Sequence, residues 1–544
     1  MADPHARNAL PHVMIVAAEC KGLAKVGGLA DVVHDLSVEL VKQGVRVTLL
    51  LPGYEQIPVT GPTVLTTMVQ FAGLAHSIAV EEVSGSDFTA DIIRCPAFFG
   101  GDYGSVYVDS AKHGGGPFED DAARFAFFST AVAQLLLREE RYEGVEVLHC
   151  HDWHTGTLAL LARLSPQYAA LRQLPILFTI HNLDYQGQRP MHAGAAPPTA
   201  SLQGWFPQDS PLFEQPPYLQ KLQDPVATDC YNPMRAAIEL ADFVSTVSPN
   251  YAFEITQPDD PARSFVGGRG LESILASRAA DGTLVGLLNG IDYHEFDPEQ
   301  LEPPFALSYR NWHTAKGIHK EKLRQRLCTA DICDAPDVAG ALLECDDADS
   351  FAQLPLLVAV TRLAGQKVSL LFQELASGSL LDILARLPAN ILVLGTGEYG
   401  QRLQECLAHN ANNIQHISRF DQGLADQLYA AGDIFLMPSD FEPCGISQMI
   451  AMRFGTVPIV TPVGGLADTV QDGRNGYHVP VGASRQEVGE ALCETVSRAV
   501  ADCSQRPEVF GNLQERAMAS RFTWEASATA YARIYQNIRR GPCT

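Results

Sequence analysis

Short runs of apolar and β-branched residues alternate along the chain with longer segments in which apolar residues recur at helical spacing. Continuous apolar runs are typical of strands that are buried on both faces beneath crossover helices, as in parallel sheets. The pattern therefore predicts an α/β protein with two Rossmann-like domains in tandem. The runs that we expect to be strands are 12–18, 45–51, 145–149, 176–180, 243–247 and 285–288 in the first half, and 355–360, 390–394, 434–437 and 457–461 in the second.

The boundary between the two domains is expected after residue 288. Here the sequence Asn289-Gly290-Ile291-Asp292 follows a predicted strand, and Asn-Gly favours a turn. Trp524 opens a segment with apolar or aromatic residues at helical spacing, which predicts a terminal helix packed on one of the domains. Residues 190–225 and the acidic stretch 331–349 show little periodicity and are expected to be surface insertions, the second a solvated loop.

Composition and charge exclude several classes of protein. The chain has 544 residues, of which 46% are hydrophobic and 19% charged, so it can build large cores. Its formal charge of −24 argues against binding to nucleic acid or to an anionic membrane surface, but not against one small phosphorylated ligand in a local basic pocket. No apolar stretch of membrane-spanning length is present, and the 12 cysteines show no paired spacing. We expect a cytoplasmic protein with neither a disulfide framework nor a structural zinc site.

Two adjacent glycines follow the first predicted strand. Gly27 and Gly28 lie in the segment Lys-Val-Gly-Gly-Leu-Ala-Asp that runs from Lys25 to Asp31, just before a helical pattern. Glycines let a ligand approach the backbone, and the N-terminus of a helix attracts an anion, to which Lys25 would add a positive charge. A tight turn that binds nothing is the alternative, since the segment matches neither G-x-G-x-x-G nor the Walker A sequence.

Polar and aromatic residues also cluster after two later strands, in 149–156 (His-Cys-His-Asp-Trp-His-Thr-Gly) and 179–187 (Thr-Ile-His-Asn-Leu-Asp-Tyr-Gln-Gly). Open α/β sheets bind ligands at the carboxyl ends of their strands, and this mixture of side chains suits a carbohydrate. We expect no metal on His149, His151 and His154, because a strand followed by a turn would point them in different directions. Histidines satisfied within the core are the alternative for each.

The second half carries two further motifs. Arg362 and Lys367 follow a predicted strand and suit a pyrophosphate, although a solvated surface pair is the alternative. Glu442 lies in a loop stiffened by Pro and Gly, so its carboxylate is expected to be held in one direction, and Gly445 precedes a helix that offers another anion site. Cys444 is expected to be a packing residue, because no Cys-His-Asn signature accompanies it.

These segments resemble those of bacterial glycogen synthases and plant starch synthases, in the same order. The resemblance extends from about Met14 to Tyr535. It rests on Lys-x-Gly-Gly-Leu at 25–29, His-Asp-Trp-His-x-Gly at 151–156, His-Asn-Leu-x-Tyr-Gln-Gly at 181–187, Thr-Val-Ser-Pro at 246–249, Asn-Gly-Ile-Asp at 289–292, Arg-Leu-x-x-Gln-Lys at 362–367, Phe-Glu-Pro-Cys-Gly at 441–445 and Gly-Gly-Leu-Ala-Asp-Thr-Val at 464–470.

The resemblance implies a retaining glucosyltransferase of the GT-B architecture, with two Rossmann-like domains facing each other across a deep cleft. It implies transfer of glucose from ADP-glucose to the non-reducing 4-hydroxyl of an α-1,4-glucan, without a metal or other cofactor. The implied division is an N-terminal domain over 1–288 on the acceptor side, a C-terminal domain over 289–523 on the nucleotide-sugar side, and a helix over 524–544 that crosses back to the first domain.

The same resemblance assigns roles to individual residues. The expected catalytic residues are Glu442, His181, Lys367 and Arg362. The residues expected to bind the donor are Lys25, Gly27, Gly28, Asp31, Asn289, Arg362, Lys367, Cys444, Gly445 and Phe420. The residues expected to line the cleft toward the acceptor are Asp152, Trp153, His154, Tyr185 and Gln186. Phe420 aligns near the family's base pocket, and ordinary core packing is its alternative.

The chain departs from the family pattern at three positions. Val368 replaces the usual glycine, Asp440 stands where a basic residue is common, and Arg235 stands where lysine is common. Two other functions remain open: a catalytically silent glucan-binding scaffold of the same fold, and a related transferase that uses another sugar nucleotide. The sequence predicts no oligomeric state.

Overall fold

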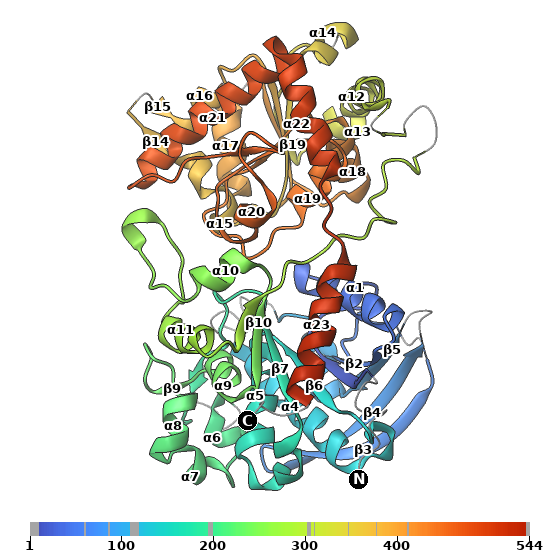
Figure 1. Cartoon of the computed structure of the whole chain (residues 1–544), viewed down its shortest axis with the longest axis vertical. Coiled ribbons are helices and arrows are strands. Elements are labelled where there is room, and N and C mark those ends of the chain that lie inside the picture. The colour runs from blue at the N-terminus through green and yellow to red at the C-terminus, as the bar shows by residue number, and fades with distance from the viewer. Residues whose placement is uncertain are drawn as a thin grey trace.

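The computed structural model describes residues 10–58, 61–84, 88–108, 119–193, 200–301, 306–308, 310–333, 335–345, 347–376, 378–410 and 413–539. The chain forms two α/β halves stacked along the long axis of the molecule, and the last helix runs back from the second half to the first (Figure 1). Among the described helices, none is both long enough and apolar enough to cross a membrane.

The N-terminal half is built on a nine-stranded sheet of order β11-β10-β7-β6-β1-β2-β5-β4-β3. The strands from β11 to β5 run parallel, while β4 and β3 are antiparallel additions at one edge. The strands are β1 (His12–Val16), β2 (Arg46–Pro52), β3 (Thr63–Phe71), β4 (Leu74–Ser84), β5 (Thr89–Arg94), β6 (Val147–His151), β7 (Ile176–Ile180), β10 (Phe243–Thr246) and β11 (Leu284–Gly286). The six predicted strands of this half are confirmed, and β3, β4 and β5 were not predicted.

Helices cover this first sheet. The α-helices are α1 (Gly28–Lys42), α2 (Pro96–Phe99), α4 (Glu119–Arg138), α5 (Gly156–Leu164), α6 (Leu202–Trp205), α7 (Ser210–Phe213), α8 (Pro216–Leu222), α9 (Pro233–Leu240), α10 (Pro249–Glu254) and α11 (Glu272–Ala280), and the 3₁₀ helices are η1 (Gly101–Tyr103), η2 (Glu140–Tyr142), η3 (Trp153–Thr155), η4 (Pro166–Gln173) and η6 (Pro261–Arg263). A two-stranded ribbon joins β8 (Arg189–Pro190) to β9 (Cys230–Tyr231).

The expectation that 190–225 is a plain surface insertion is wrong for its described part. Trp205, Phe213 and Leu222 are each at most 3% exposed, because the short helices α6, α7 and α8 turn these residues into the core. The sequence pattern did not reveal α7 and α8 because these helices have only 4 and 7 residues, which is too short to show helical periodicity.

The C-terminal half has a seven-stranded sheet of order β12-β17-β16-β13-β18-β19-β20. Its strands are β12 (Val338–Gly340), β13 (Leu356–Val360), β16 (Asn390–Leu394), β17 (Ile414–Ile417), β18 (Ile434–Met437), β19 (Val457–Val460) and β20 (Tyr477–His478), and β14 (Glu374–Leu375) pairs separately with β15 (Gly378–Ser379). The four predicted strands, β13, β16, β18 and β19, are confirmed. The acidic stretch 331–349 is not only a solvated loop, because it supplies β12, an antiparallel edge strand on β17.

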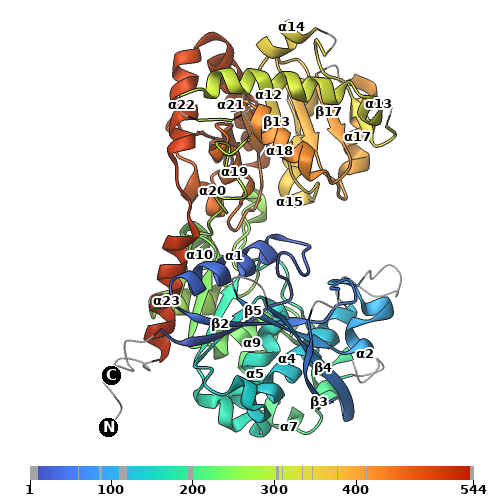
Figure 2. The same cartoon turned by 90° about the vertical axis from the view of Figure 1, so that its right-hand side faces the viewer.

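Helices also flank the second sheet, where α15 and α20 lie on the side toward α10 of the first half (Figure 2). They are α12 (Trp312–Leu327), α13 (Ala330–Cys333), α14 (Ala348–Gln353), α15 (Gly365–Val368), η7 (Ser369–Phe372), α16 (Leu380–Leu384), α17 (Gly400–Asn410), α18 (Gln422–Ala431), α19 (Ser447–Arg453), α20 (Gly464–Thr469), α21 (Arg485–Gln505), α22 (Pro507–Ala519) and α23 (Trp524–Arg539).

Helix α23 leaves the second half and lies beside α1 in both views (Figures 1 and 2). The side-chain amide of Gln43 donates to the carbonyl of Glu525 (3.0 Å), and the hydroxyl of Tyr535 bonds Nδ1 of His149 on β6 (2.7 Å). Where the chain crosses between the halves, the N–H of Ile291 donates to the carbonyl of Phe522 (2.9 Å). Two segments of the chain therefore connect the halves, and a backbone hydrogen bond joins them at the crossing.

Candidate active site

The glycine-rich segment after β1 is fixed by hydrogen bonds to the carboxylate of Glu19, a residue that the sequence pattern did not indicate. Glu19 is 2% exposed, and its Oε2 accepts hydrogen bonds from the N–H groups of Val26 (2.6 Å) and Gly27 (2.8 Å). Helix α1 then begins at Gly28. The N–H of Gly27 is thus committed to Glu19, so an anion at this helix end would meet the N–H groups from Gly28 onward.

Lys25 and Asp31 form an ion pair across the first turn of α1. Their Nζ–Oδ1 distance is 2.6 Å, and the lysine side chain is 49% exposed. Burial raises the pKa of Asp31, and Lys25 opposes that shift. The pair is accessible, so a phosphate group could compete with Asp31 for the ammonium of Lys25.

The histidines after β6 lie closer together than the sequence predicted. His149 and His151 both belong to β6, and their ring centroids are 4.1 Å apart. The expectation that these side chains point in different directions is wrong for this pair, because the strand runs two residues further and positions i and i+2 share a face. Among the described residues, no three His, Cys, Asp or Glu side chains form a group that could hold a metal ion.

His181 joins the two polar segments of the first half. Its Nε2 bonds Nδ1 of His151 (2.8 Å), and its backbone N–H donates to Oδ1 of Asp152 (2.7 Å). Asp152 has a φ of 54°, a left-handed conformation that costs free energy for a residue other than glycine and recurs at functional sites. Burial raises the pKa of Asp152 to about 7 and lowers the pKa of His181 to about 3, so the imidazole is neutral at physiological pH.

Trp153 and His154 are both buried and do not present an open surface. Trp153 is 3% exposed and stacks on His154, with ring centroids 4.4 Å apart. A Cβ on Gly187 would lie 2.2 Å from the Trp153 ring, which explains the glycine in the second polar segment. His154 also bonds the hydroxyl of Tyr107 (3.2 Å), which donates to Glu19 (2.8 Å). The glycine-rich loop and the histidine segment therefore share one hydrogen-bond network.

Tyr185 and Gln186 have different environments although they are neighbours. Tyr185 is 46% exposed, whereas Gln186 is 4% exposed. The amide nitrogen of Gln186 donates to the carbonyls of Leu183 (3.2 Å) and Arg269 (3.1 Å), and its oxygen accepts from Asn232 (2.6 Å). In this structure Gln186 braces the loop, and a contact with the acceptor stays a prediction for it.

In the C-terminal half, Lys367 and Glu442 form an ion pair. Lys367 belongs to α15 after β13, and Glu442 lies on the loop after β18, a strand that runs parallel to β13 as its direct neighbour. The carboxyl ends of the two strands therefore meet, and the side chains are only 14% and 8% exposed. Arg362 is exposed and has no ion pair with any described residue, so it is available to an anion.

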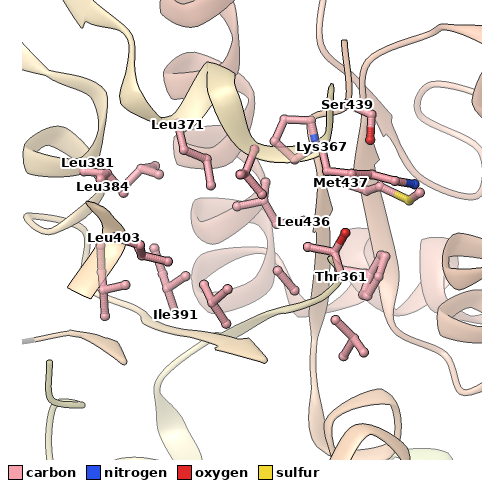
Figure 3. Close-up of a pocket in the computed structure, with 17 residues that line it drawn as sticks. Thr361, Lys367, Leu371, Leu381, Leu384, Ile391, Leu403, Leu436, Met437 and Ser439 are labelled. Atoms are coloured by element: carbon pink, nitrogen blue, oxygen red, sulfur yellow. The ribbon is translucent and has the colours of Figure 1, made fainter. Parts of the chain in front are cut away.

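A small cavity in the core of the C-terminal half borders Lys367 (Figure 3). It encloses about 30 Å³, and most of its walls are aliphatic, with Lys367 and Ser439 among the few polar residues that line it. That volume suits no more than about one water molecule. At this volume the cavity is too small to hold a sugar nucleotide.

Two glycines of α20 fix the loop that carries Glu442. A Cβ on Gly464 would lie 1.9 Å from the carbonyl oxygen of Glu442, and one on Gly465 would lie 2.1 Å from that of Cys444. Cys444 is 6% exposed, and burial raises its pKa to about 12. The thiol stays protonated at neutral pH, which favours the packing role and not a nucleophilic one.

Helix α10 of the first half docks on this same loop. Ser248 Oγ donates to the carbonyl of Pro443 (2.6 Å), and the backbone N–H of Asn250 donates to Asp468 (2.8 Å). The carboxylate of Glu254 accepts the N–H of Gly464 at 2.9 and 3.0 Å. The sequence resemblance included Ser248, but nothing in it indicated Asn250 or Glu254.

The three remaining donor-site candidates, Asn289, Gly445 and Phe420, have different environments. Asn289 is 4% exposed, and its amide oxygen is buried with no hydrogen-bond partner among the described residues. Gly445 has a φ of 72°, which favours glycine. Phe420 is 86% exposed, so the alternative of core packing is wrong for it.

The unusual Asp440 is neutralised within the protein. Its Oδ2 lies 2.9 Å from the guanidinium of Arg485, the first residue of α21, and accepts the hydroxyl of Ser369 (2.7 Å). Arg485 thus supplies a positive charge beside the position where the family often has a basic residue. Val368 is 3% exposed and packs in the core.

Known protein families match both halves. A family model for the starch synthase catalytic domain matches residues 12–277, and one for glycosyl transferases group 1 matches residues 355–498. A glycogen synthase of Geotalea uraniireducens is 33% identical over 538 residues, covering 96% of this chain and 98% of that protein. The chain belongs to the glycogen synthase family. A glycogen synthase of Moorella thermoacetica is also 33% identical, with 96% of each chain covered.

Solved structures agree with this family. The catalytic domain of starch synthase IV from Arabidopsis thaliana, bound to ADP and acarbose, is 28% identical with a TM-score of 0.77, covering 98% of this chain and all of that chain. A sucrose-phosphate synthase from Thermosynechococcus elongatus has a TM-score of 0.55 at 17% identity, which shows the fold alone. The predicted GT-B architecture and glycosyltransferase class of this glycogen synthase family member are confirmed.

Proposed function

We propose that the protein transfers glucose from ADP-glucose to the non-reducing 4-hydroxyl of an α-1,4-glucan, with retention of anomeric configuration and without a metal. Membership of the glycogen synthase family supports this reaction, as does the likeness to a starch synthase bound to ADP and acarbose. The observation that carries the proposal is the buried pair Lys367 and Glu442, which brings a cation and a carboxylate together at the carboxyl edge of the second sheet.

In the proposed reaction, the bond between the anomeric carbon and the diphosphate oxygen breaks. Negative charge grows on the leaving oxygen, and positive charge grows on the sugar ring. Lys367 and Arg362 would stabilise the diphosphate, because fixed cations in a partly dry site act strongly on developing charge. The N–H groups at the start of α1 and the accessible Lys25 would add to this field from the other half.

Glu442 would stabilise and orient the glucosyl unit rather than bond to it covalently. Its carboxylate is held by Lys367 and by a long hydrogen bond from Ser439 (3.4 Å). His181 is neutral because its pKa is about 3, so its imidazole would bind sugar hydroxyls without adding charge. The unpartnered amide oxygen of Asn289 would accept a further hydroxyl.

The acceptor would approach from the N-terminal half, where Tyr185 offers an exposed ring. We assign residues 1–288 to the acceptor side, 289–523 to the nucleotide-sugar side and 524–544 to the terminal segment, whose described helix α23 (Trp524–Arg539) packs against the first half. The membership of the two sheets and the bond from Tyr535 to His149 support this division. We also propose a cytoplasmic location, which the lack of paired cysteine spacing supports.

Incubation of the purified protein with radiolabelled ADP-glucose and glycogen, with and without each component, tests the function. Label in the polymer that α-1,4-specific hydrolysis releases is expected only when both substrates are present. A catalytically silent scaffold would bind glycogen but transfer no label, and a transferase for another sugar nucleotide would respond only to a different donor. Activity in excess EDTA is expected to equal the untreated rate, and a loss that added magnesium restores would contradict the metal-free mechanism.

A further inference from the structure

A concave site lies on the outer side of the C-terminal half, between α21 and α22. It encloses about 380 Å³ and is open to solvent. Its polar lining residues are Tyr477, Arg498, Asp502, Arg506, Asn512 and Arg516. We call it the arginine hollow. None of these residues was a candidate from the sequence, because they come from three separate segments.

Helical spacing explains why three arginines converge here. Arg498 and Asp502 are four residues apart on α21, and Asn512 and Arg516 are four apart on α22, so each pair shares a helix face. Arg506 is the single residue between the two helices. The sharp turn at this residue places the two faces opposite each other.

The hollow has an excess of positive charge. Asp502 is 4% exposed, forms an ion pair with Arg506 and accepts the hydroxyl of Tyr477 (2.8 Å), so its charge is neutralised within the protein. Arg498 lies over the Tyr477 ring, 5.1 Å from its centroid.

Two of the three guanidinium groups remain available to a ligand. Arg498 reaches Asp472 only at 3.4 Å, in a pair whose side chains are about half exposed. Arg516 has no ion pair or side-chain hydrogen bond with any residue in the described part of the chain. The arginine hollow is therefore a positively charged site in a protein whose net charge is −24.

We propose that the arginine hollow binds a small phosphorylated anion. The planar fork of a guanidinium matches two oxygens of a phosphate, and several such forks around one concavity provide both charge and geometry. The volume falls in the range of about 300–1,000 Å³ that is usual for small-molecule sites, so it exceeds the need of a bare phosphate. The ring of Tyr477 and the amide of Asn512 border the space that the organic part of the ligand would fill.

The hollow is separate from the catalytic residues but is linked to them by one helix. Arg485 at the start of α21 contacts Asp440, two residues before Glu442. Arg498 follows 13 positions later, which is about 20 Å along an α-helix. Anion binding in the hollow is therefore distinguishable from binding at the catalytic site.

Isothermal titration calorimetry on the full chain tests the proposal, with inorganic phosphate and glycerol 3-phosphate as probes and glycerol as the uncharged control. The double variant Arg498→Gln/Arg516→Gln is expected to weaken binding of both phosphorylated probes by about tenfold or more. The variant Arg386→Gln, which changes an exposed arginine elsewhere in the same half, is expected to bind like the wild type. Lys367→Ala is also expected to retain binding, because it alters only the catalytic site.

Three outcomes would overturn the proposal: no binding of either probe at about 10 mM, equal binding by the wild type and the double variant, or loss of binding in Lys367→Ala alone. Arg516→Lys serves as a control for misfolding, because it keeps the positive charge but lacks the planar guanidinium that binds two phosphate oxygens. Its binding is expected to fall between that of the wild type and that of the double variant, at an unchanged melting temperature.

Discussion

The ammonium group of Lys367 pairs with the carboxylate of Glu442, although the two residues stand 75 positions apart in the chain. The pairing follows from topology, because β13 and β18 are parallel neighbours, so the loops that lead from their carboxyl ends to the next helices lie side by side. Before a donor binds, each charge neutralises the other in a site with little solvent. A diphosphate beside Lys367 would release part of that interaction and leave Glu442 free to act on the sugar.

We predict that Lys367→Ala and Glu442→Ala each lower kcat about 100-fold or more. Removing one charge that acts mainly on the transition state costs roughly 3 kcal/mol, which corresponds to about two orders of magnitude in rate. Initial rates with ADP-glucose and glycogen measure the effect, and circular dichroism checks that each variant is folded. The double variant is expected to lose less than the product of the single losses, because each single change leaves the other charge buried without its partner.

A matched control is Lys42→Ala, which removes a lysine that is 58% exposed at the end of α1. Its turnover should equal that of the wild type. Turnover near the wild-type value in either Lys367→Ala or Glu442→Ala would contradict the assigned roles.

A second prediction concerns Glu19, which holds the glycine-rich loop. Its carboxylate accepts the N–H groups of Val26 and Gly27 and the hydroxyl of Tyr107. Glu19→Gln keeps the size but turns one acceptor into a donor, and hydrogen bonds to charged groups are worth about 1.5–3 kcal/mol. We expect kcat/KM for the sugar nucleotide to fall about tenfold or more.

Tyr107→Phe serves as the partial version of this change, because it removes one of the three hydrogen bonds to Glu19. Its loss should be smaller than that of Glu19→Gln. If Glu19→Gln lowers only the melting temperature and leaves kcat/KM unchanged, Glu19 supports the fold and does not position the loop for the donor.

Most strands of the parallel cores could be predicted because each is a short, continuous apolar run, whereas polar residues interrupt the parallel strands β5 and β17, which were not predicted. β3 was missed as well, because its residues alternate between exposed positions and partly or fully buried ones. Such a strand carries a weaker apolar signal than one covered on both faces. Likewise β12 has no buried residue and was hidden within an acidic stretch.

The residues of the candidate site also fall into those that the sequence indicated and those that it did not. Family motifs marked Lys367 and Glu442, and the fold brings them together. Glu19, Tyr107 and Glu254 escaped because each contacts a motif residue from outside the motif. Glu19 lies 8 positions before Gly27, whereas Tyr107 and Glu254 lie 47 and 210 positions from the motif residues that they contact. A single sequence holds no pattern for such contacts, which exist only once the loops are packed.

A third prediction concerns the pH dependence of stability at the contact between the halves. Burial raises the pKa of Glu254 to about 7, while its carboxylate accepts hydrogen bonds from Gly464 and Asn250. Between about pH 4.5 and 7 the folded state keeps this proton and the unfolded state loses it. The contribution to stability is thus fully present below about pH 4.5 and is lost as pH rises to about 7, by up to about 1.4 kcal/mol per pH unit.

Glu254→Gln removes this titration. Relative to the wild type, the variant's melting temperature is expected to be higher at pH 8 than at pH 5, as measured by calorimetry in matched buffers. Glu299→Gln, at an exposed position, should show the same difference from the wild type at both pH values. A flat difference for Glu254→Gln as well would contradict the raised pKa.

The last prediction concerns the nucleotide. Family relatives include a starch synthase whose structure holds ADP, and Phe420 offers an aromatic face that is 86% exposed at the end of the segment after β17. An aromatic ring overlaps more with a purine than with a pyrimidine. We expect kcat/KM for ADP-glucose to exceed that for UDP-glucose by more than about tenfold, a difference of about 1.4 kcal/mol. Phe420→Ala should reduce the ratio of kcat/KM for ADP-glucose to that for UDP-glucose. Phe420→Leu should reduce this ratio nearly as much, since leucine keeps the apolar volume but not the ring. Side-by-side initial rates with glycogen measure both kcat/KM values for each protein. Equal use of both donors by the wild type would contradict the adenine preference, whereas a retained preference in Phe420→Ala would place the base contact on other residues.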